Sequence, residues 1–283
     1  DNLYNAIHLP DQSSSHPVAI ETEGGEQITY AEFHAWTGRY AAWVQSRGVR
    51  AGERVLVQAD KSAQLLMLCY AVMRAGAVFV PINVGARRAE VSSVLADCEP
   101  SLVICDPRRK AMFESLTAEL GAPASIDTLT ASGRGTAVEQ AEATTPSAGS
   151  SVVPADAPAA LMYTSGTTGR PKAAIITHGN ILSNGEALRE HWRWSARDVP
   201  LHTLPLYHLH GLFVATMPSL LSGSKILLYR RFIARQAVAA LPRASVFMGV
   251  PTYFARMLAV PALTQRQCAT VRMFIAGSAP LRE

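Results

Sequence analysis

Short apolar runs alternate with longer amphipathic segments along much of the chain. The runs Arg54–Gln58, Ala77–Val80 and Leu102–Cys105 predict buried strands, and the segments Ser62–Ala75 and Arg87–Cys98 between them predict helices. Strands that alternate with helices of about 10–15 residues are typical of parallel sheets. The pattern therefore predicts an α/β fold with mostly parallel sheets flanked by helices.

The first 26 residues differ from this pattern because they are polar and rich in turn-forming residues, and we expect them to drape over the surface. Thr29 and Glu32 then form a capping box that begins a helix, and Gly48 ends it. The aromatic residues of this helix recur at helical spacing, so we interpret them as core. Stacking on a cofactor is the alternative use of such a stripe.

A change of composition divides the chain in two. Residues 121–158 are rich in Ala, Ser, Thr, Gly and Pro, which predicts a surface linker at the end of a first α/β subdomain, residues 1–158. The second part, residues 159–283, resumes the alternation. Its predicted strands are Ala159–Tyr163, Ala173–Thr177, Lys225–Tyr229, Ser245–Val250 and Val271–Ala276, with helices at about 179–194, at 232–241 and after Pro251.

Composition indicates a large folded core, since 48% of the 283 residues are hydrophobic and 17% are charged. The four cysteines form no C-x-x-C pair, and no signal peptide precedes the first element, which together predict a cytoplasmic protein with reduced thiols. The apolar run Leu65–Ile82 is interrupted by Arg74, Gly76 and Pro81, so we predict core and no membrane span. No feature of the sequence indicates an oligomeric state.

The charges are unevenly placed. Residues 199–282 contain nine Lys or Arg and no Asp or Glu, which favours an electropositive face for an anionic small molecule. Chance placement of surface arginines is the alternative. Nucleic acid is not the predicted partner, because these residues are dispersed singly along the chain and do not form a basic stripe interleaved with aromatic residues.

The segment Tyr163–Lys172, YTSGTTGRPK, concentrates small, hydroxylated and flexible residues and ends in a lysine. Glycines that accept positive φ, successive backbone amides and a mobile ammonium group are suited to hold a polyphosphate. Only two residues separate Gly166 from Gly169, and Ala173 follows the lysine. This spacing excludes the kinase-type loop, which needs four residues between its glycines and a hydroxyl after its lysine. The loop is also predicted to join two strands, whereas the kinase-type loop joins a strand to a helix.

This segment resembles the signature of the AMP-forming adenylating enzymes, the superfamily of acyl-CoA synthetases, luciferases and peptide-synthetase adenylation domains. Most members have glycine where this chain has Ala173. The resemblance covers the whole chain and implies the N-terminal α/β domain of such an enzyme. It also implies a reaction in which a carboxylate attacks the α-phosphorus of ATP, pyrophosphate leaves, and the thiol of coenzyme A then displaces AMP.

By that resemblance, the loop would bind the pyrophosphate end of ATP, with Thr164 as a contact for Mg²⁺ and Lys172 as a catalytic cation. The loop residues so implied are Thr164, Ser165, Gly166, Thr167, Thr168, Gly169 and Lys172. The adenine ring would lie against the loop after the last strand, formed by Gly277, Ser278, Ala279 and Pro280. His208 would position the carboxylate and gate the path to it. A buried core position is our prediction for the neighbouring His210.

The acyl group is predicted from a second set of residues. The segments LPLYHLHGLFVAT, MGVPTYFARML and FIAGSAPL look most like those of the malonyl-CoA synthetases. In those enzymes an arginine at the position of Arg256 and a serine at that of Ser278 read the second carboxylate of malonate. The planar fork of arginine suits a carboxylate, and a buried arginine would obstruct the apolar tunnel of a long-chain acid. The alternative for Arg256 is a solvated helix face.

The resemblance also implies elements with no counterpart before Glu283. They are the glutamate that completes the magnesium site, the aspartate that holds the ribose, and the C-terminal lid domain with its lysine. We therefore expect the front part of a longer enzyme that is poorly active or inactive alone. A ligase for another short or aromatic carboxylate, a non-catalytic nucleotide- or acyl-binding fragment, and a phosphoryl-transfer enzyme that releases ADP are the alternatives.

Overall fold

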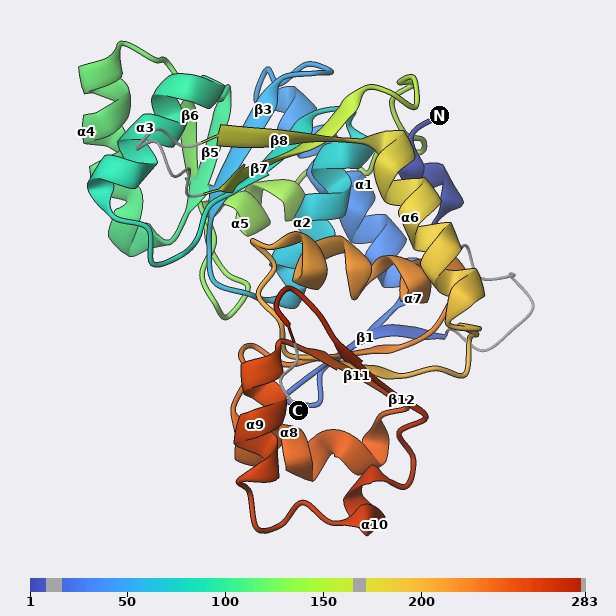
Figure 1. Cartoon of the computed structure of the whole chain (residues 1–283). Coiled ribbons are helices and arrows are strands. Elements are labelled where there is room, and N and C mark those ends of the chain that lie inside the picture. The colour runs from blue at the N-terminus through green and yellow to red at the C-terminus, as the bar shows by residue number, and fades with distance from the viewer. Residues whose placement is uncertain (9–16, 165–171, 281–283) are drawn as a thin grey trace. The chain divides into compact units, whose positions relative to one another are not determined.

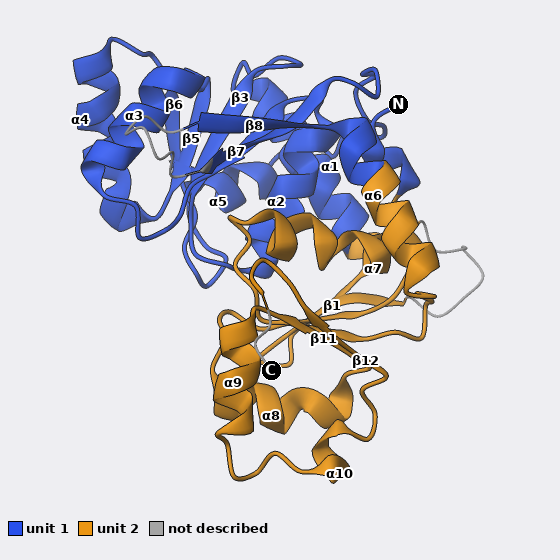
Figure 2. Cartoon of the chain, in the orientation of Figure 1, with its two compact units in different colours: residues 1–6, 33–182 blue, residues 7–32, 183–283 orange. Residues whose placement is uncertain are grey.

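The computed structural model describes residues 1–8, 17–164 and 172–280 (Figure 1). The chain forms two compact units (Figure 2). Unit 1 comprises residues 1–6 and 33–182, and unit 2 comprises residues 7–32 and 183–283. The chain changes unit at three places: after η1 (Leu3–Ala6), inside α1 (Tyr30–Ser46) and inside α6 (His178–His191). The division predicted at 158/159 does not coincide with any of these boundaries, because the strands on either side of the glycine-rich loop join the sheet of unit 1.

Unit 1 is built on a six-stranded sheet with the strand order β6-β5-β3-β4-β7-β8. All neighbouring strands are parallel except β7 and β8. The strands are β3 (Arg54–Gln58), β4 (Val78–Pro81), β5 (Leu102–Cys105), β6 (Ser125–Thr128), β7 (Pro158–Thr164) and β8 (Lys172–Thr177). The helices are η1 (Leu3–Ala6), α2 (Ala63–Arg74), α3 (Arg88–Cys98), η2 (Pro107–Arg109), α4 (Lys110–Leu120) and α5 (Thr136–Glu142).

The direction of the chain places the helices of unit 1. The connection through α2 leads from β3 to β4, and the connection through α3 leads back across β3 to β5. Because such crossovers are right-handed, the two helices cover opposite faces of the sheet. Ser62 caps α2 by accepting a hydrogen bond from the Leu65 amide (3.1 Å), and the helix is buried nearly all round. No helix of the described residues combines the length and apolarity needed to cross a membrane.

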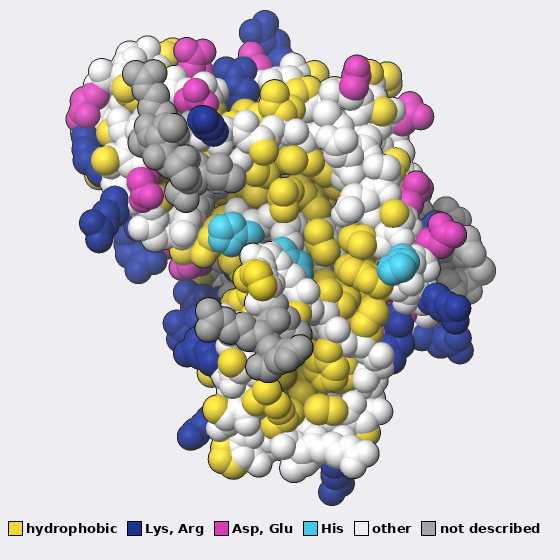
Figure 3. Space-filling model, viewed as in Figure 1, with side chains coloured by type: hydrophobic (Ala, Val, Ile, Leu, Met, Phe, Trp, Pro, Cys, Tyr) yellow, Lys and Arg dark blue, Asp and Glu magenta, His cyan; other side chains and the backbone are white. Residues whose placement is uncertain are grey.

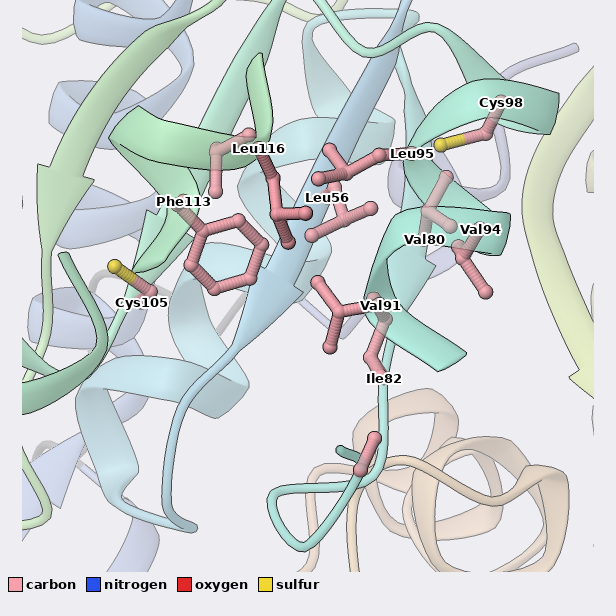
Figure 4. Close-up of a cluster of buried hydrophobic side chains, with 12 residues drawn as sticks. Leu56, Val80, Ile82, Val91, Val94, Leu95, Cys98, Cys105, Phe113 and Leu116 are labelled. Atoms are coloured by element: carbon pink, nitrogen blue, oxygen red, sulfur yellow. The ribbon is translucent and has the colours of Figure 1, made fainter. Parts of the chain in front are cut away.

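Helices α3 and α4 pack together over the sheet and form a buried apolar cluster (Figure 4). Phe113 and Leu116 of α4 meet Val91 and Leu95 of α3, and Leu56 of β3 lies beneath them. Burying each of these side chains contributes roughly 1.5–3 kcal/mol relative to exposure. The apolar runs that predicted strands in this half of the chain thus form the sheet surface against which these helices pack.

The predicted surface linker, residues 121–158, contributes to the core of unit 1. It forms β6, which pairs in parallel with β5, and α5, where Ala137 and Ala141 are fully buried. Its later part is held by Arg74, whose guanidinium donates to the carbonyls of Ser147 (2.7 Å) and Gly149 (3.1 Å). The composition of the segment did not predict these elements, because they are stabilised by backbone pairing and by small buried residues.

Unit 2 is built on a second six-stranded sheet, with the order β12-β11-β9-β10-β1-β2. Only β1 and β2 are antiparallel neighbours. The strands are β1 (Val18–Thr22), β2 (Gln27–Thr29), β9 (Pro200–His202), β10 (Ile226–Leu228), β11 (Val246–Gly249) and β12 (Met273–Ala276). The helical segments are η3 (His210–Val214), α7 (Met217–Ser222), α8 (Ala234–Ala240), η4 (Leu241–Arg243), α9 (Pro251–Leu258) and α10 (Gln265–Cys268).

The prediction that the first 26 residues drape over the surface is wrong for two segments. Leu3, Tyr4 and Ile7 near the N-terminus are buried. Residues 18–22 form β1, which pairs in parallel with β10 and buries Ala19 and Ile20 completely. The strand is short and surrounded by polar residues, so its apolar residues are too few to stand out as a periodic pattern. The predicted fold class is confirmed: both units are mostly parallel sheets flanked by helices.

Candidate functional site

The predicted phosphate loop joins β7 to β8 in unit 1, as the sequence indicated. Thr164 ends β7, Lys172 begins β8, and the two residues are partners across the antiparallel pair. Directly opposed residues in such a pair have Cα atoms about 4.5–5.5 Å apart, so the two ends of the loop lie side by side. Lys172 is exposed. The other predicted loop residues, Ser165, Gly166, Thr167, Thr168 and Gly169, lie outside the described residues.

Tyr163 anchors the entry to this loop. Its hydroxyl donates to Asp97 Oδ2 of α3 at 2.5 Å. Burial raises the pKa of Tyr163, and the neighbouring Asp97 carboxylate raises it further, so the phenol remains a neutral donor. The last turn of α3 thereby holds the end of β7 from which the loop departs.

Unit 1 also contains a cavity of about 360 Å³ at the carboxyl ends of β3 and β5. The two strands are parallel neighbours, but the chain leads from β3 to β4 on one side and from β5 to β6 on the other. Their carboxyl ends therefore form a topological switch point, the usual place for a ligand in such folds. Gln58, Asp60, Asp106, Arg108 and Arg109 line it. Gln58 is 1% exposed, and its Oε1 has no hydrogen-bond partner among the described residues. Both guanidinium groups of the lining already have partners, since Arg108 pairs with Asp106 at 2.7 Å and Arg109 donates to the carbonyls of Ala86 (3.1 Å) and Val84 (2.9 Å).

In unit 2, the predicted adenine-binding segment follows β12. The Gly277 amide donates to the Gly249 carbonyl (3.1 Å), which extends the pairing of β12 with β11 by one residue. Ser278 has a φ of 68°, a left-handed conformation that few residues other than glycine adopt. Strained backbone of this kind is concentrated at ligand sites. Ser278, Ala279 and Pro280 are exposed.

The structure brings His210, and not His208, against Ser278. His210 Nδ1 lies 3.2 Å from Ser278 Oγ, and a Cβ at Gly277 would approach His210 Cε1 to 3.1 Å. His210 is half-buried, which differs from the predicted core position. His208 is exposed and lies against Tyr207, with ring centroids 4.6 Å apart. Partial desolvation lowers the pKa of both histidines, which favours neutral rings.

Arg256 lies on α9, beside an aromatic stack. Phe232 and Tyr253 are stacked with centroids 3.8 Å apart, and the Arg256 guanidinium lies 5.9 Å from the Phe232 centroid. Burial raises the pKa of Tyr253, the nearby Tyr207 adds to this, and Arg256 opposes it. Arg256 is exposed, so burial supplies no argument against a long-chain acid. Among the described residues, no ion pair joins Arg256 to an acid, and no hydrogen bond joins it to Ser278 or His208.

Part of the basic excess in residues 199–282 is neutralised inside unit 2. Lys225 and Arg243 both pair with the buried Glu21, and Arg272 pairs with the buried Asp198 at 2.6 Å. The acids stand outside the acid-free range, so the sequence count could not reveal the pairing. On the face drawn in Figure 3, Lys and Arg side chains stand in several separate groups.

A cluster of His, Cys, Asp and Glu side chains can hold a metal ion. Within the described part of the chain, no group of three or more His, Cys, Asp and Glu side chains is placed to do so. Thr164 was the predicted magnesium contact, and its backbone stands at the end of β7. That assignment stays a prediction.

The curated proteins that this chain resembles include enzymes that join a carboxylate to coenzyme A. A feruloyl-CoA synthase of Amycolatopsis sp. is 31% identical over 272 residues, which is 95% of this chain and 52% of the relative. A mitochondrial malonate–CoA ligase of Homo sapiens is 31% identical over 211 residues, or 73% of this chain and 36% of the relative. The chain spans about half the length, or less, of the curated relatives it matches.

Among solved structures, the ATP-bound MatB of Rhodopseudomonas palustris matches with a TM-score of 0.93 and 38% identity. The match covers 99% of this chain and 55% of that one. The model of the AMP-binding enzyme family matches residues 9–283. Together with the hairpin that carries YTSGTTGRPK, these matches establish that the chain belongs to the AMP-binding enzymes.

Proposed function

We propose that the protein containing this chain activates a short carboxylate, most favourably malonate, in an ATP-dependent reaction. The carboxylate attacks the α-phosphorus of ATP to give an acyl-adenylate and pyrophosphate, and the thiol of coenzyme A then displaces AMP. The observation that carries the malonate assignment is the chemistry of unit 2. There, Arg256 has no acidic partner among the described residues, and His210 and Ser278 form a polar pair.

A dicarboxylate needs a cation for the carboxylate that does not react. The Arg256 guanidinium, which lies 5.9 Å from the centroid of the Phe232 ring, can hold a carboxylate through two parallel hydrogen bonds. His210 and Ser278 offer a donor pair, and we propose both as substrate contacts together with His208. The similarity to MatB and to the human malonate–CoA ligase supports this choice.

ATP would be held in two places by this proposal. The pyrophosphate end would lie on the loop between Thr164 and Lys172, with Mg²⁺ against Thr164 to neutralise charge that develops on the phosphoryl oxygens. The adenine ring would lie on Gly277–Pro280.

An aromatic carboxylate is the second candidate. The similarity to feruloyl-CoA synthase favours it, and so does the stack formed by Phe232 and Tyr253, against which an aromatic ring could pack.

ATP–pyrophosphate exchange by the full-length protein would separate these candidates, with acetate, malonate, methylmalonate, benzoate, ferulate and a long-chain acid compared. Release of AMP is expected, and release of ADP would contradict adenylate formation. We expect malonate to give the highest kcat/KM. A preference for ferulate would reject malonate and keep the adenylating reaction.

The role of Arg256 gives a sharper prediction. Arg256→Ala should lower kcat/KM for malonate by about 100-fold, because a charged hydrogen-bonded pair is lost, and should change that for acetate by less than about threefold. Arg266→Ala, at an exposed arginine of α10, is the matched control and should leave both values near wild type. Equal losses on malonate and acetate would contradict the assignment.

A further inference from the structure

The segment that carries the two histidines of unit 2 contains an unusually wide helical turn. From His210 to Val214 the chain forms a single π-helical turn, in which the Ala215 amide donates to the His210 carbonyl (3.0 Å). Such turns are rare in proteins as a whole, but those that occur are often found at functional sites. A wide turn leaves backbone groups without partners inside the helix, so other groups must bond to them. The partners in this protein are side chains.

Two buried side chains take up the carbonyls of this turn. Within the described residues 172–280, no helical amide bond reaches the carbonyls of Gly211 and Leu212, because the Ala215 amide donates to the His210 carbonyl and the Thr216 amide donates to the Phe213 carbonyl (3.3 Å). The Gly211 carbonyl accepts from His202 Nε2 at 2.6 Å, and the Leu212 carbonyl accepts from the hydroxyl of Thr216. A carbonyl oxygen can only accept, so His202 Nε2 carries the proton.

His202 is fixed by its place in the sheet of unit 2. It is the last residue of β9, is 2% exposed, and its own carbonyl accepts from the Tyr229 amide (3.0 Å). Strand β9 lies inside the sheet, between β11 and β10. A side chain fixed in this way can set the position of a neighbouring loop.

The turn has little freedom to settle elsewhere. A Cβ at Gly211 would lie 2.1 Å from the Pro205 carbonyl oxygen, so the backbone of the turn is packed directly against the loop before it. His210 begins the turn, with Nδ1 3.2 Å from Ser278 Oγ, and the Leu212 amide donates to the His208 carbonyl (2.8 Å). A shift of Gly211 would therefore move both histidines.

We propose that His202 is a positioning residue for the carboxylate site. By holding the Gly211 carbonyl, it sets the place of the His210 ring relative to Ser278, and it acts on the substrate only through His210. The inference rests on the proposed function, because it takes His210 and Ser278 as carboxylate contacts. It needs no particular carboxylate.

The test is a double-mutant cycle in the full-length protein, with whichever carboxylate the wild type activates best. His202→Leu removes the donor from the Gly211 carbonyl, and His202→Gln supplies another. We expect His202→Leu to raise the KM for the carboxylate about tenfold and to leave that for ATP within about twofold. His202→Gln should recover most of the loss. In a His210→Ala background, His202→Leu should change the carboxylate KM by less than about twofold.

Other outcomes would overturn the proposal. If His202→Leu raises the carboxylate KM equally in both backgrounds, His202 does not act through His210. If both His202 variants lower the melting temperature but leave the carboxylate KM unchanged, the residue is structural only. A wild type that prefers ferulate to malonate would refute the malonate assignment, and the cycle with ferulate would still decide the role of His202.

Discussion

At the scale of single residues, His178 shows how burial fixes a protonation state. The residue follows β8 and is completely buried. Its Nδ1 accepts a hydrogen bond from the Leu3 amide (3.2 Å), and its Nε2 has no hydrogen-bond partner among the described residues. Burial lowers the pKa of His178 to about 4. A neutral ring is thus part of the anchor that holds the N-terminal η1 in unit 1.

This pKa predicts how stability depends on pH. An unfolded histidine titrates near pH 6.5, so between about pH 6.5 and 4 the unfolded state binds a proton that the folded state does not. The contribution of His178 to the free energy of unfolding should be complete above pH 6.5 and fall by up to roughly 3 kcal/mol towards pH 4. Urea unfolding at pH 7, 6, 5 and 4 measures it.

The matched comparison uses variants that do not titrate in this range. His178→Gln should flatten the loss of stability between pH 6.5 and 4, whereas His191→Gln, at an exposed position, should keep the wild-type slope. A slope that His178→Gln leaves unchanged would show that other groups cause it.

At the scale of elements, the strands β3 and β5 appear at their predicted residues, because continuous apolar runs bounded by turns specify buried parallel strands. The loop between β7 and β8 was equally predictable from its glycines. The elements of residues 121–158 were not. Strand β6 is specified by its pairing with β5. Helix α5 begins after Gly135, which packs against the backbone of Thr128.

Gly135 provides a test of that order. It has a φ of 138°, and a Cβ there would lie 2.3 Å from the Thr128 carbonyl oxygen at the end of β6. Gly135→Ala should therefore destabilise unit 1 by about 2 kcal/mol or more, since the new atom forces β6 and α5 apart. Chemical denaturation, monitored by circular dichroism, measures the loss.

Gly149 offers the control within the same segment. An added Cβ there meets no atom within 4 Å, and its φ is not positive, so Gly149→Ala should change stability by no more than about 0.5 kcal/mol. If the two substitutions had equal small effects, residues 128–135 would not be packed as described.

At the scale of the whole molecule, long-range contacts decide what the sequence could not. The spacing of motifs correctly placed Gly277–Pro280 after the last strand of the chain. It could not tell which of the two neighbouring histidines meets Ser278, because the contact joins residues 68 apart in the chain. The same holds for the pairing of Glu21 with Lys225 and Arg243, which removes part of the predicted electropositive face.

Arg74 is the strongest case of such a long-range contact. It is 6% exposed and binds segments from three parts of unit 1, since its guanidinium donates to the Tyr4 hydroxyl, to the His34 carbonyl and, as described above, to the segment 147–149. The guanidinium also lies 4.7 Å from the centroid of the Tyr4 ring. In the sequence it merely interrupts an apolar run, yet it connects the N-terminus of unit 1 to the predicted linker.

Arg74→Met tests that connection because it keeps the apolar stem and removes every donor. Buried carbonyls and hydroxyls would lose their partners, so the free energy of unfolding should fall by about 3 kcal/mol or more. Residues 147–151 should also exchange their amide hydrogens faster, because the arginine no longer holds them. Arg50→Met, where the side chain is 85% exposed and pairs with Glu53, should cost no more than about 0.5 kcal/mol. Similar losses for the two variants would mean that the bonds of Arg74 add no more to stability than a surface ion pair does.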